Sequence, residues 1–157
     1  FLFDLIRNSL KKKISQIIKQ GIKINIIGTK KGLPLDIKKI IKLIEKKTKK
    51  NKKITLNLAL NYGSKEEIIS GFKSLISKKN KVININNFEK ELYTKGLPDP
   101  EILIRTGGAK RLSNFLLWQL AYTEIFFIDK LWPDFNENDF NKVINKFYSV
   151  KRNFGNI

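Results

Sequence analysis

Segments with the spacing of β-strands alternate with segments that have the spacing of helices, and this alternation restricts the fold more than any other feature. Apolar runs at residues 22–28 and 54–60 indicate strands. Each run is followed by a glycine-containing turn, and helical spacing then begins at residue 35 and again after Ser64. This order predicts one α/β domain over residues 1–157, with an open and mainly parallel sheet. Helices are expected on both faces, in a three-layer sandwich.

The remaining segments follow the same logic. Residues 1–19 have the pattern of an amphipathic helix, and a short helix is predicted between residues 81 and 95. A central strand is predicted at Ile102–Ile104, and the apolar run Ile125–Ile128 indicates another buried strand. Asn136 precedes a final helical pattern in the position of an N-cap.

The loop after the central strand has the composition of an anion site. It lies at the C-terminal end of Ile102–Ile104, where open α/β sheets place their ligands. Gly107 and Gly108 allow a tight turn and the approach of a ligand to the backbone amides, and Arg105 and Arg111 stand on either side. Ser113 precedes an apolar run as an N-cap would, so its hydroxyl and the first helical N–H groups are predicted to meet the same anion.

Arginine usage supports this interpretation. The chain has 32 basic residues, but its arginines are only those at positions 7, 105, 111 and 152, and two of them flank the loop. A planar guanidinium grips phosphate oxygens in pairs, which lysine does not do. The alternative is a surface turn with two solvated arginines, and the local pattern leaves it open.

Glu124 is a second candidate for function. Its carboxylate stands directly before the apolar run Ile125–Ile128, so it needs a partner. A structural arginine would serve, and so would a hard divalent cation such as Mg²⁺, which one or two carboxylates and substrate phosphates commonly hold. Both interpretations remain open at this point.

The composition excludes several classes of mechanism and of location. The chain has no cysteine and no histidine, so it has no disulfide framework, no thiolate metal site and no Ser/His/Asp or Cys/His mechanism. No apolar run approaches the roughly 20 residues of a membrane span, and Asp4 and Arg7 interrupt the short apolar start. A soluble, cytoplasmic protein is therefore expected. Because the sequence contains no methionine and begins at Phe1, we expect it to be the C-terminal part of a longer protein.

The net charge of +18 raises the question of a nucleic-acid partner. Lysine, isoleucine and asparagine are all abundant, as in proteins from AT-rich genomes, and the lysines are dispersed in runs such as Lys46–Lys53 without interleaved aromatic residues. We therefore expect no nucleic-acid partner.

Several of these motifs together resemble one family. The stretches Ile104–Gly108, Arg111–Gln119 and Leu131–Phe135, with Glu124 between them, resemble the cis-prenyltransferases, in particular the bacterial undecaprenyl diphosphate synthases. Asn61-Tyr62-Gly63 resembles a further block of that family. The resemblance implies an enzyme that condenses isopentenyl diphosphate repeatedly with an allylic diphosphate such as farnesyl diphosphate. The product is a long Z-polyprenyl diphosphate, and Mg²⁺ assists.

The resemblance also implies roles for particular residues. Arg105, Arg111 and Ser113 match the positions that hold isopentenyl diphosphate, and Glu124 matches a carboxylate that helps to bind the metal. Five apolar residues match walls of the product tunnel, with ordinary core packing as the alternative for each: Leu2, Leu5, Ile6, Ile54 and Leu56. The family implies a homodimer, which we expect to form around Tyr122–Phe135. It also implies that the product, and with it the protein, is peripheral to the membrane.

The chain departs from the family pattern in three places. It lacks the Asp-Gly-Asn-Gly-Arg loop that cradles the allylic diphosphate, so no catalytic residue is expected here and the chain alone is predicted to be inactive. Ser64-Lys65 replaces the usual Gly-Arg, and Asn153 stands where an arginine reaches the partner subunit. Two alternatives remain: a non-catalytic subunit of a prenyltransferase dimer, and a basic protein that binds nucleic acid.

Overall fold

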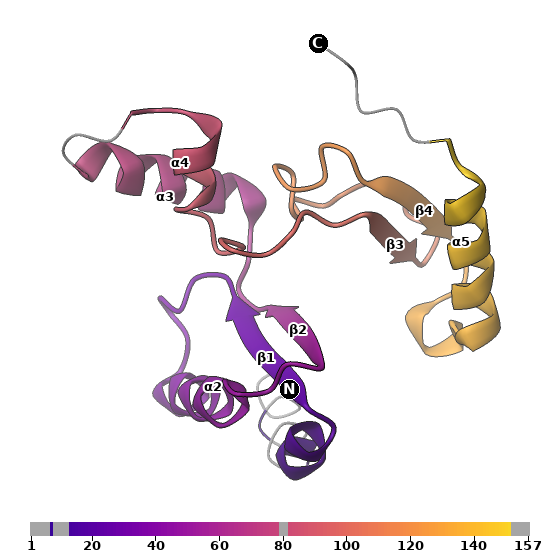
Figure 1. The fold of residues 1–157 in the computed structure, drawn as a ribbon, viewed down its shortest axis with the longest axis horizontal. Helices are drawn as coiled ribbons and strands as arrows, with labels where there is room; N and C mark the ends of the chain where they lie inside the picture. Colours follow the sequence, from indigo (N-terminus) through magenta and orange to yellow (C-terminus); the bar gives the residue numbers. More distant parts are fainter. Residues whose placement is uncertain (1–6, 8–12, 79–81, 152–157) are drawn as a thin grey trace.

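The computed structural model describes residue 7, residues 13–78 and residues 82–151. It is an α/β structure with parallel strands, which confirms the predicted class (Figure 1). Residues 13–19 are helical, and the elements that follow are β1 (Ile22–Ile27), α2 (Leu35–Thr48), β2 (Ile54–Ala59), α3 (Ser64–Ser77), α4 (Ile85–Glu89), β3 (Ile102–Thr106), β4 (Glu124–Ile128), the short 3₁₀ helix η1 (Trp132–Asp134) and α5 (Glu137–Ser149).

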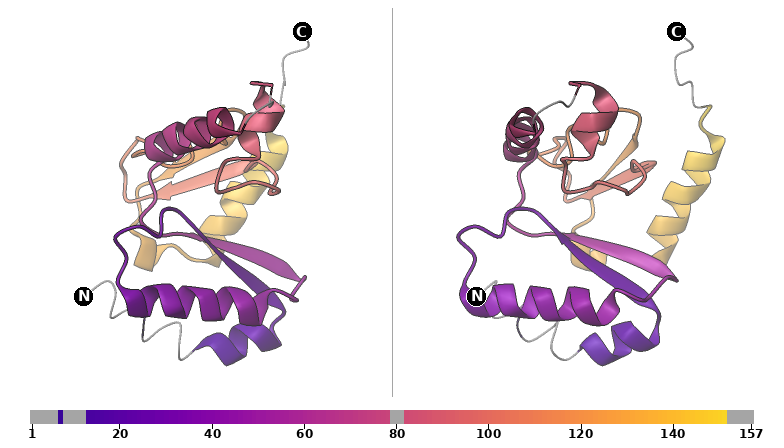
Figure 2. Two further views of the ribbon diagram at one scale, coloured as in Figure 1. Left: turned by 90° about the vertical axis from the view of Figure 1, so that its left-hand side faces the viewer. Right: turned by 60° about the vertical axis from the view of Figure 1, so that its left-hand side comes forward.

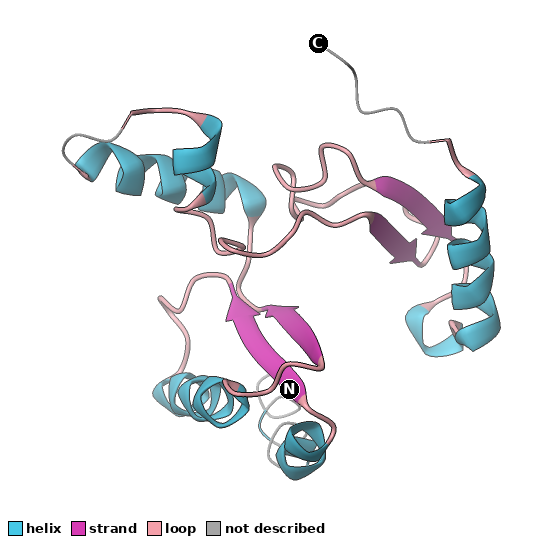
Figure 3. Ribbon diagram, in the orientation of Figure 1, coloured by secondary structure: helices cyan, strands magenta, loops and turns pink. Residues whose placement is uncertain are grey.

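The strands form two parallel pairs instead of the one continuous sheet that the alternation predicts. In the described residues, β1 pairs with β2 and β3 pairs with β4, and the two pairs are separate (Figure 3). Ile24 lies opposite Leu56 in the first pair, and Arg105 lies opposite Phe127 in the second. The predicted sheet is therefore present as two halves.

One edge of the first pair is closed by side chains of α2 and of the turn after it. On the edge of β1 that faces away from β2, the N–H of Ile24 donates to Thr48 Oγ1 at 3.1 Å and the N–H of Ile26 donates to Glu45 Oε1 at 3.1 Å. Asn51 donates to the carbonyl of Ile22 at 2.7 Å. These bonds satisfy backbone groups that an edge strand would otherwise leave open, so no neighbouring strand is needed there.

Helix α2 also supplies the core beneath this pair. Its buried face carries Ile37 and Ile41, which cluster with Leu33 and pack against Ile26 and Leu60. The helical spacing of these isoleucines leaves the lysines of α2 on the outer side. Figure 2 shows α2 and the helix at residues 13–19 on the same side of the β1–β2 pair.

A shared apolar cluster joins the two pairs. Ile27 at the end of β1 is buried together with Leu116 and Leu120 from the segment after β3, and Leu103 of β3 packs against them. A second cluster joins α3 and α4 to that same segment through Trp118. The segment between β3 and β4 is thus fixed by residues from both halves of the molecule.

Helix α5 lies beside the β3–β4 pair (Figure 1). The predicted N-cap is confirmed, because the side chain of Asn136 accepts from the N–H groups of Asn138 and Asp139, and Asp139 accepts in return from the N–H of Asn136. None of the helices that the structure describes has both the length and the apolar character needed to cross a membrane.

Candidate functional site

The Gly-Gly turn lies at the C-terminal end of β3, where the sequence predicts a ligand, but its amides are occupied. Gly107 and Gly108 have φ angles of +87° and +71°, which explains why glycine stands there. The N–H of Gly107 donates to the carbonyl of Lys130 at 2.8 Å, and that of Gly108 donates to the carbonyl of Ile128 at 3.1 Å. The prediction that a ligand approaches these amides is therefore wrong. The two N–H groups instead hold the end of β3 to the end of β4.

Arg105 and Ser113 lie together beside this turn. Nη1 of Arg105 donates to Oγ of Ser113 at 3.2 Å, and both line a pocket of about 300 Å³. The other lining residues are Leu103, Ile104, Thr106, Leu112 and Phe115, and none of these carries a carboxylate. The buried Nε of Arg105 has no hydrogen-bond partner among the described residues. A guanidinium with an unused donor and no carboxylate in the pocket lining is suited to an anion.

Arg111 is exposed on the same loop and does not line the pocket that contains Arg105. The structure therefore brings two of the three predicted diphosphate-binding residues into contact and places the third nearby on the surface.

Ser113 does not begin a helix, which corrects the sequence prediction. An N-cap residue has extended backbone angles, whereas φ is +49° at Ser113, +61° at Asn114 and +45° at Leu116. Left-handed residues break the right-handed path, so residues 113–122 form a series of turns. Any anion at Ser113 is consequently bound by side chains, without a helix N-terminus.

Asn114 was missed in the sequence, although it makes three hydrogen bonds to the start of α3. Its carbonyl accepts from the N–H of Ser64 at 2.8 Å, and its Oδ1 accepts from the N–H of Lys65 at 2.8 Å. Its Nδ2 donates to Glu66 at 3.0 Å, and the N–H of Leu117 donates to Oγ of Ser64 at 2.9 Å. These bonds fasten the segment to the start of α3.

Glu67 is a second residue that connects separate segments and that the sequence analysis did not identify. Its side chain is only 2% exposed and accepts from the hydroxyl of Tyr62. It also accepts from the N–H of Tyr93 at 2.7 Å and from Nε2 of Gln119 at 3.2 Å. Burial, and then the hydrogen bond to this carboxylate, raise the pKa of Tyr62 well above its ordinary value of 10.0. Glu67 therefore joins three segments that are distant in the sequence.

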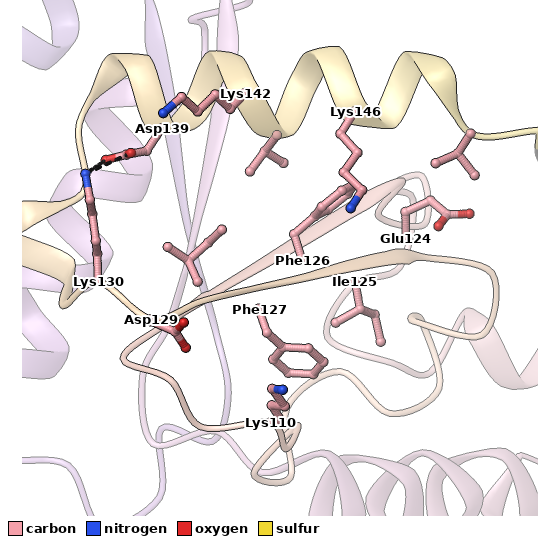
Figure 4. A pocket seen from close by; sticks show the side chains of 13 residues that line it. Lys110, Glu124, Ile125, Phe126, Phe127, Asp129, Lys130, Asp139, Lys142 and Lys146 are labelled. Atoms are coloured by element: carbon pink, nitrogen blue, oxygen red, sulfur yellow. Dashed lines mark hydrogen bonds and ion pairs between the residues drawn. The ribbon is translucent and has the colours of Figure 1, made fainter.

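Glu124 lies away from the Arg105 pocket. It is the first residue of β4 and pairs with Ile102, whereas Arg105 pairs with Phe127. Three residues along a strand separate the two positions by about 10 Å. Glu124 lines a groove of about 620 Å³ between β4 and α5, with Lys146 at the same end and the Lys130–Asp139 ion pair at the other (Figure 4). No arginine is among the residues that line this groove.

Residues 1–155 of the chain match the undecaprenyl diphosphate synthase family. The chain belongs to this family. An isoprenyl transferase from Prochlorococcus marinus is 48% identical over 163 aligned residues, which cover 100% of this chain and 60% of that protein. The family membership confirms the resemblance inferred from the sequence motifs.

Solved structures agree with this assignment. The crystal structure of a probable undecaprenyl diphosphate synthase from Campylobacter jejuni superposes with a TM-score of 0.90 at 36% identity, covering 99% of this chain and 74% of that chain. Lavandulyl diphosphate synthase from Lavandula x intermedia, in complex with dimethylallyl diphosphate, gives a TM-score of 0.86 at 33% identity, covering 98% of this chain and 67% of that one.

The described residues of this synthase-family chain do not by themselves form a complete Mg²⁺ site. They contain no group of three or more acidic, histidine or cysteine side chains that could hold a metal ion. The groove of Glu124 also contains Asp129 and Asp139, but its four lysines, Lys110, Lys130, Lys142 and Lys146, outnumber the carboxylates and disfavour a cation. At most, Glu124 fits as a single ligand in a set completed by other groups.

The predicted tunnel residues fall into two groups. Leu2, Leu5 and Ile6 lie outside the described residues, as does Asn153. Ile54 and Leu56 of β2 are 58% and 44% exposed in this chain. Their role in a tunnel stays a prediction.

Proposed function

We propose that this chain supplies the isopentenyl diphosphate site of a cis-prenyltransferase, which elongates an allylic diphosphate such as farnesyl diphosphate into a long Z-polyprenyl diphosphate. The observation that carries the proposal is the pocket of Arg105 and Ser113, with a guanidinium donor left unused. The membership of an isoprenoid synthase family supports it. The bound dimethylallyl diphosphate in the lavandulyl diphosphate synthase structure is consistent with diphosphate substrates.

In this reaction the C–O bond of the allylic diphosphate breaks and diphosphate leaves with the electron pair. The alkene of isopentenyl diphosphate attacks the allylic carbon, a new C–C bond forms, and a proton is then lost. Arg105 and Ser113 would hold the diphosphate of the attacking substrate, while exposed Arg111 neutralises its outer charge. The described residues therefore orient one reactant.

Ionisation of the allylic substrate requires groups that we place outside this chain, in a longer protein. The chain spans 60% of the Prochlorococcus relative, so such a protein is the expected setting for activity. We propose Mg²⁺ as its cofactor and Glu124 as one of the ligands. In the longer protein, Glu124→Gln should reduce incorporation of labelled isopentenyl diphosphate by orders of magnitude. An unimpaired variant would exclude Glu124 from metal binding.

We further propose a homodimer that forms through the surface around Tyr122–Phe135. Trp132 is 73% exposed, and Tyr122, Leu131 and Phe127 are also exposed on this surface. Large exposed apolar side chains are typical of an interface. A stable monomer at micromolar concentration in sedimentation would contradict the proposal. We also propose that the protein contacts a membrane surface, because its polyprenyl product is apolar.

Titration of pyrophosphate into the chain tests the binding site directly. Arg105→Ala should weaken binding about tenfold or more, because it removes charge-assisted hydrogen bonds worth roughly 1.5–3 kcal/mol. Arg105→Lys should recover only part of the affinity, since it keeps the charge but loses the planar fork. Arg7→Ala is the matched control: it removes the same charge from the distant Arg7–Asp36 ion pair. Equal affinities for Arg105→Ala and Arg7→Ala would refute the proposed site.

A further inference from the structure

We propose that Asn114 is a positioning residue, which keeps Ser113 and the Arg105 pocket in their binding geometry by fastening the loop to the start of α3. This inference rests on the proposed function, because it concerns the same pocket. Asn114 is adjacent to Ser113 in the chain but does not line the pocket itself. Its role is therefore indirect, through the backbone of its neighbour.

The start of α3 is capped from outside the helix. The first N–H groups of a helix have no partners within it and are usually satisfied by the side chain of the N-cap residue. Here the N-cap is Gly63, which has no side chain to offer. The N–H groups of Ser64 and Lys65 instead donate to the backbone carbonyl and to Oδ1 of Asn114, both at 2.8 Å. Asn114 thus replaces the N-cap side chain from 49 residues away.

The packing around Gly63 explains why the cap comes from elsewhere. A Cβ at position 63 would lie 2.2 Å from Oε2 of Glu66 and 2.9 Å from Nδ2 of Asn114, closer than a Cβ normally lies to such atoms. A side chain at the N-cap would therefore require the ends of the Glu66 and Asn114 side chains to shift. The hydrogen bond from Asn114 also holds the pKa of Glu66 below its ordinary value, so the carboxylate that accepts it is ionised at neutral pH.

The loop needs such an anchor because its backbone is unfavourable. Ser113, Asn114 and Leu116 all have left-handed φ angles, although none is glycine. Conformations of this kind persist only where the surrounding structure fixes them, and asparagine tolerates them better than most residues. The N–H of Leu117 adds a further bond, to the buried Oγ of Ser64. Without these bonds, we expect Ser113 to leave the position in which it meets Arg105.

Two substitutions separate the contacts of Asn114 from its backbone conformation. Asn114→Ala removes the side-chain bonds and disfavours the left-handed angle, whereas Asn114→Gly removes the same bonds but accepts that angle freely. We expect both to weaken pyrophosphate binding to the 157-residue chain, by about tenfold for alanine and somewhat less for glycine. The amide of Lys65, which loses its acceptor, should exchange its hydrogen faster in both variants.

Asn136→Ala is the matched control, because Asn136 also caps a helix, in this case α5, away from the pocket. It should leave both the pyrophosphate affinity and the exchange at Lys65 unchanged. Wild-type affinity in Asn114→Gly would overturn the inference and leave the proposed site standing. Absence of pyrophosphate binding in the wild type would refute the proposed site instead. The exchange at Lys65 would then still decide the anchor, and unchanged exchange in both variants would overturn it.

Discussion

The two strand-loop segments of this chain contain similar turns but reach different structures. After β2, Asn61 takes a left-handed φ of +50°, and α3 then begins at Ser64 as a regular helix. After β3, Gly107 and Gly108 turn the chain in the same way, yet no helix forms between residues 109 and 123. The two segments differ in their hydrogen-bond partners. The second segment supplies acceptors, from Asn114, to the first N–H groups of α3, those of Ser64 and Lys65.

This asymmetry means that the candidate site depends on the other segment. Ser64 accepts from Leu117, and Glu67 accepts from Gln119, so two residues of α3 hold the segment that follows Ser113. An irregular loop that is fixed in this way can place side chains as firmly as a helix does. The comparison predicts that damage to α3 will be felt at the loop.

The largest effect is expected from Glu67→Ala. This change leaves the hydroxyl of Tyr62, Nε2 of Gln119 and the N–H of Tyr93 without their shared acceptor in a buried place. One unsatisfied buried donor costs about 1–3 kcal/mol, so we expect a loss of roughly 3 kcal/mol or more in the free energy of unfolding. Urea denaturation at neutral pH measures it.

Glu66→Ala is the control for that experiment, since it removes the neighbouring carboxylate, which is exposed. Surface ion and hydrogen-bond contacts of this kind contribute little to stability. If Glu66→Ala and Glu67→Ala lowered the free energy of unfolding equally, the buried network would not be the connection between the two segments.

A smaller effect is expected from Ser64→Ala, which changes the volume very little. The serine is fully buried, and its Oγ accepts from the N–H of Leu117. Removing the hydroxyl leaves that N–H unsatisfied, at a cost of about 1–3 kcal/mol. Ser77→Ala, at the far end of the same helix, removes an exposed hydroxyl that bonds only within the helix and should be nearly neutral. Equal stability of the two variants would show that the bond to Leu117 contributes nothing.

Local patterns predicted most elements of the fold. The apolar spacing located β1, α2 and β2 within one or two residues, and Asn136 marked the start of α5. These elements agree with local rules because their own residues supply the caps and the apolar faces. The separation of the strands into two pairs did not follow from those rules, since strand order depends on contacts between distant segments.

The candidate site was predicted in composition but not in geometry. Arg105 and Ser113 were identified from residue type and position, and they do lie in contact. The helix expected after Ser113 is absent because its left-handed residues are fixed by bonds from α3, between residues about 50 positions apart. The spacing of an apolar run can indicate a helix, but it does not show which distant residues will form hydrogen bonds with that run. Asn114 was therefore overlooked.

The smallest effects are expected at α5, whose cap is entirely local, and they sharpen the contrast with α3. Asn136→Ala should lower the free energy of unfolding by about 1 kcal/mol, because it removes the side-chain acceptor of the N–H groups of Asn138 and Asp139.

Asp139, the other side chain of this cap, adds a dependence on pH. The hydrogen bond from Lys130 holds the pKa of Asp139 below its ordinary value of 3.8. A carboxyl with a lowered pKa in the folded state stabilises the protein above the unfolded-state pKa and ceases to do so as the pH falls through its folded-state pKa. Asp139→Asn should therefore be slightly less stable than the wild type at pH 6, and the difference should shrink as the pH falls below 3.8 and through the folded-state pKa. Thermal unfolding of the two proteins from pH 6 downward measures it, and a difference that stays constant over this range would show that the ionised form of Asp139 does not stabilise α5.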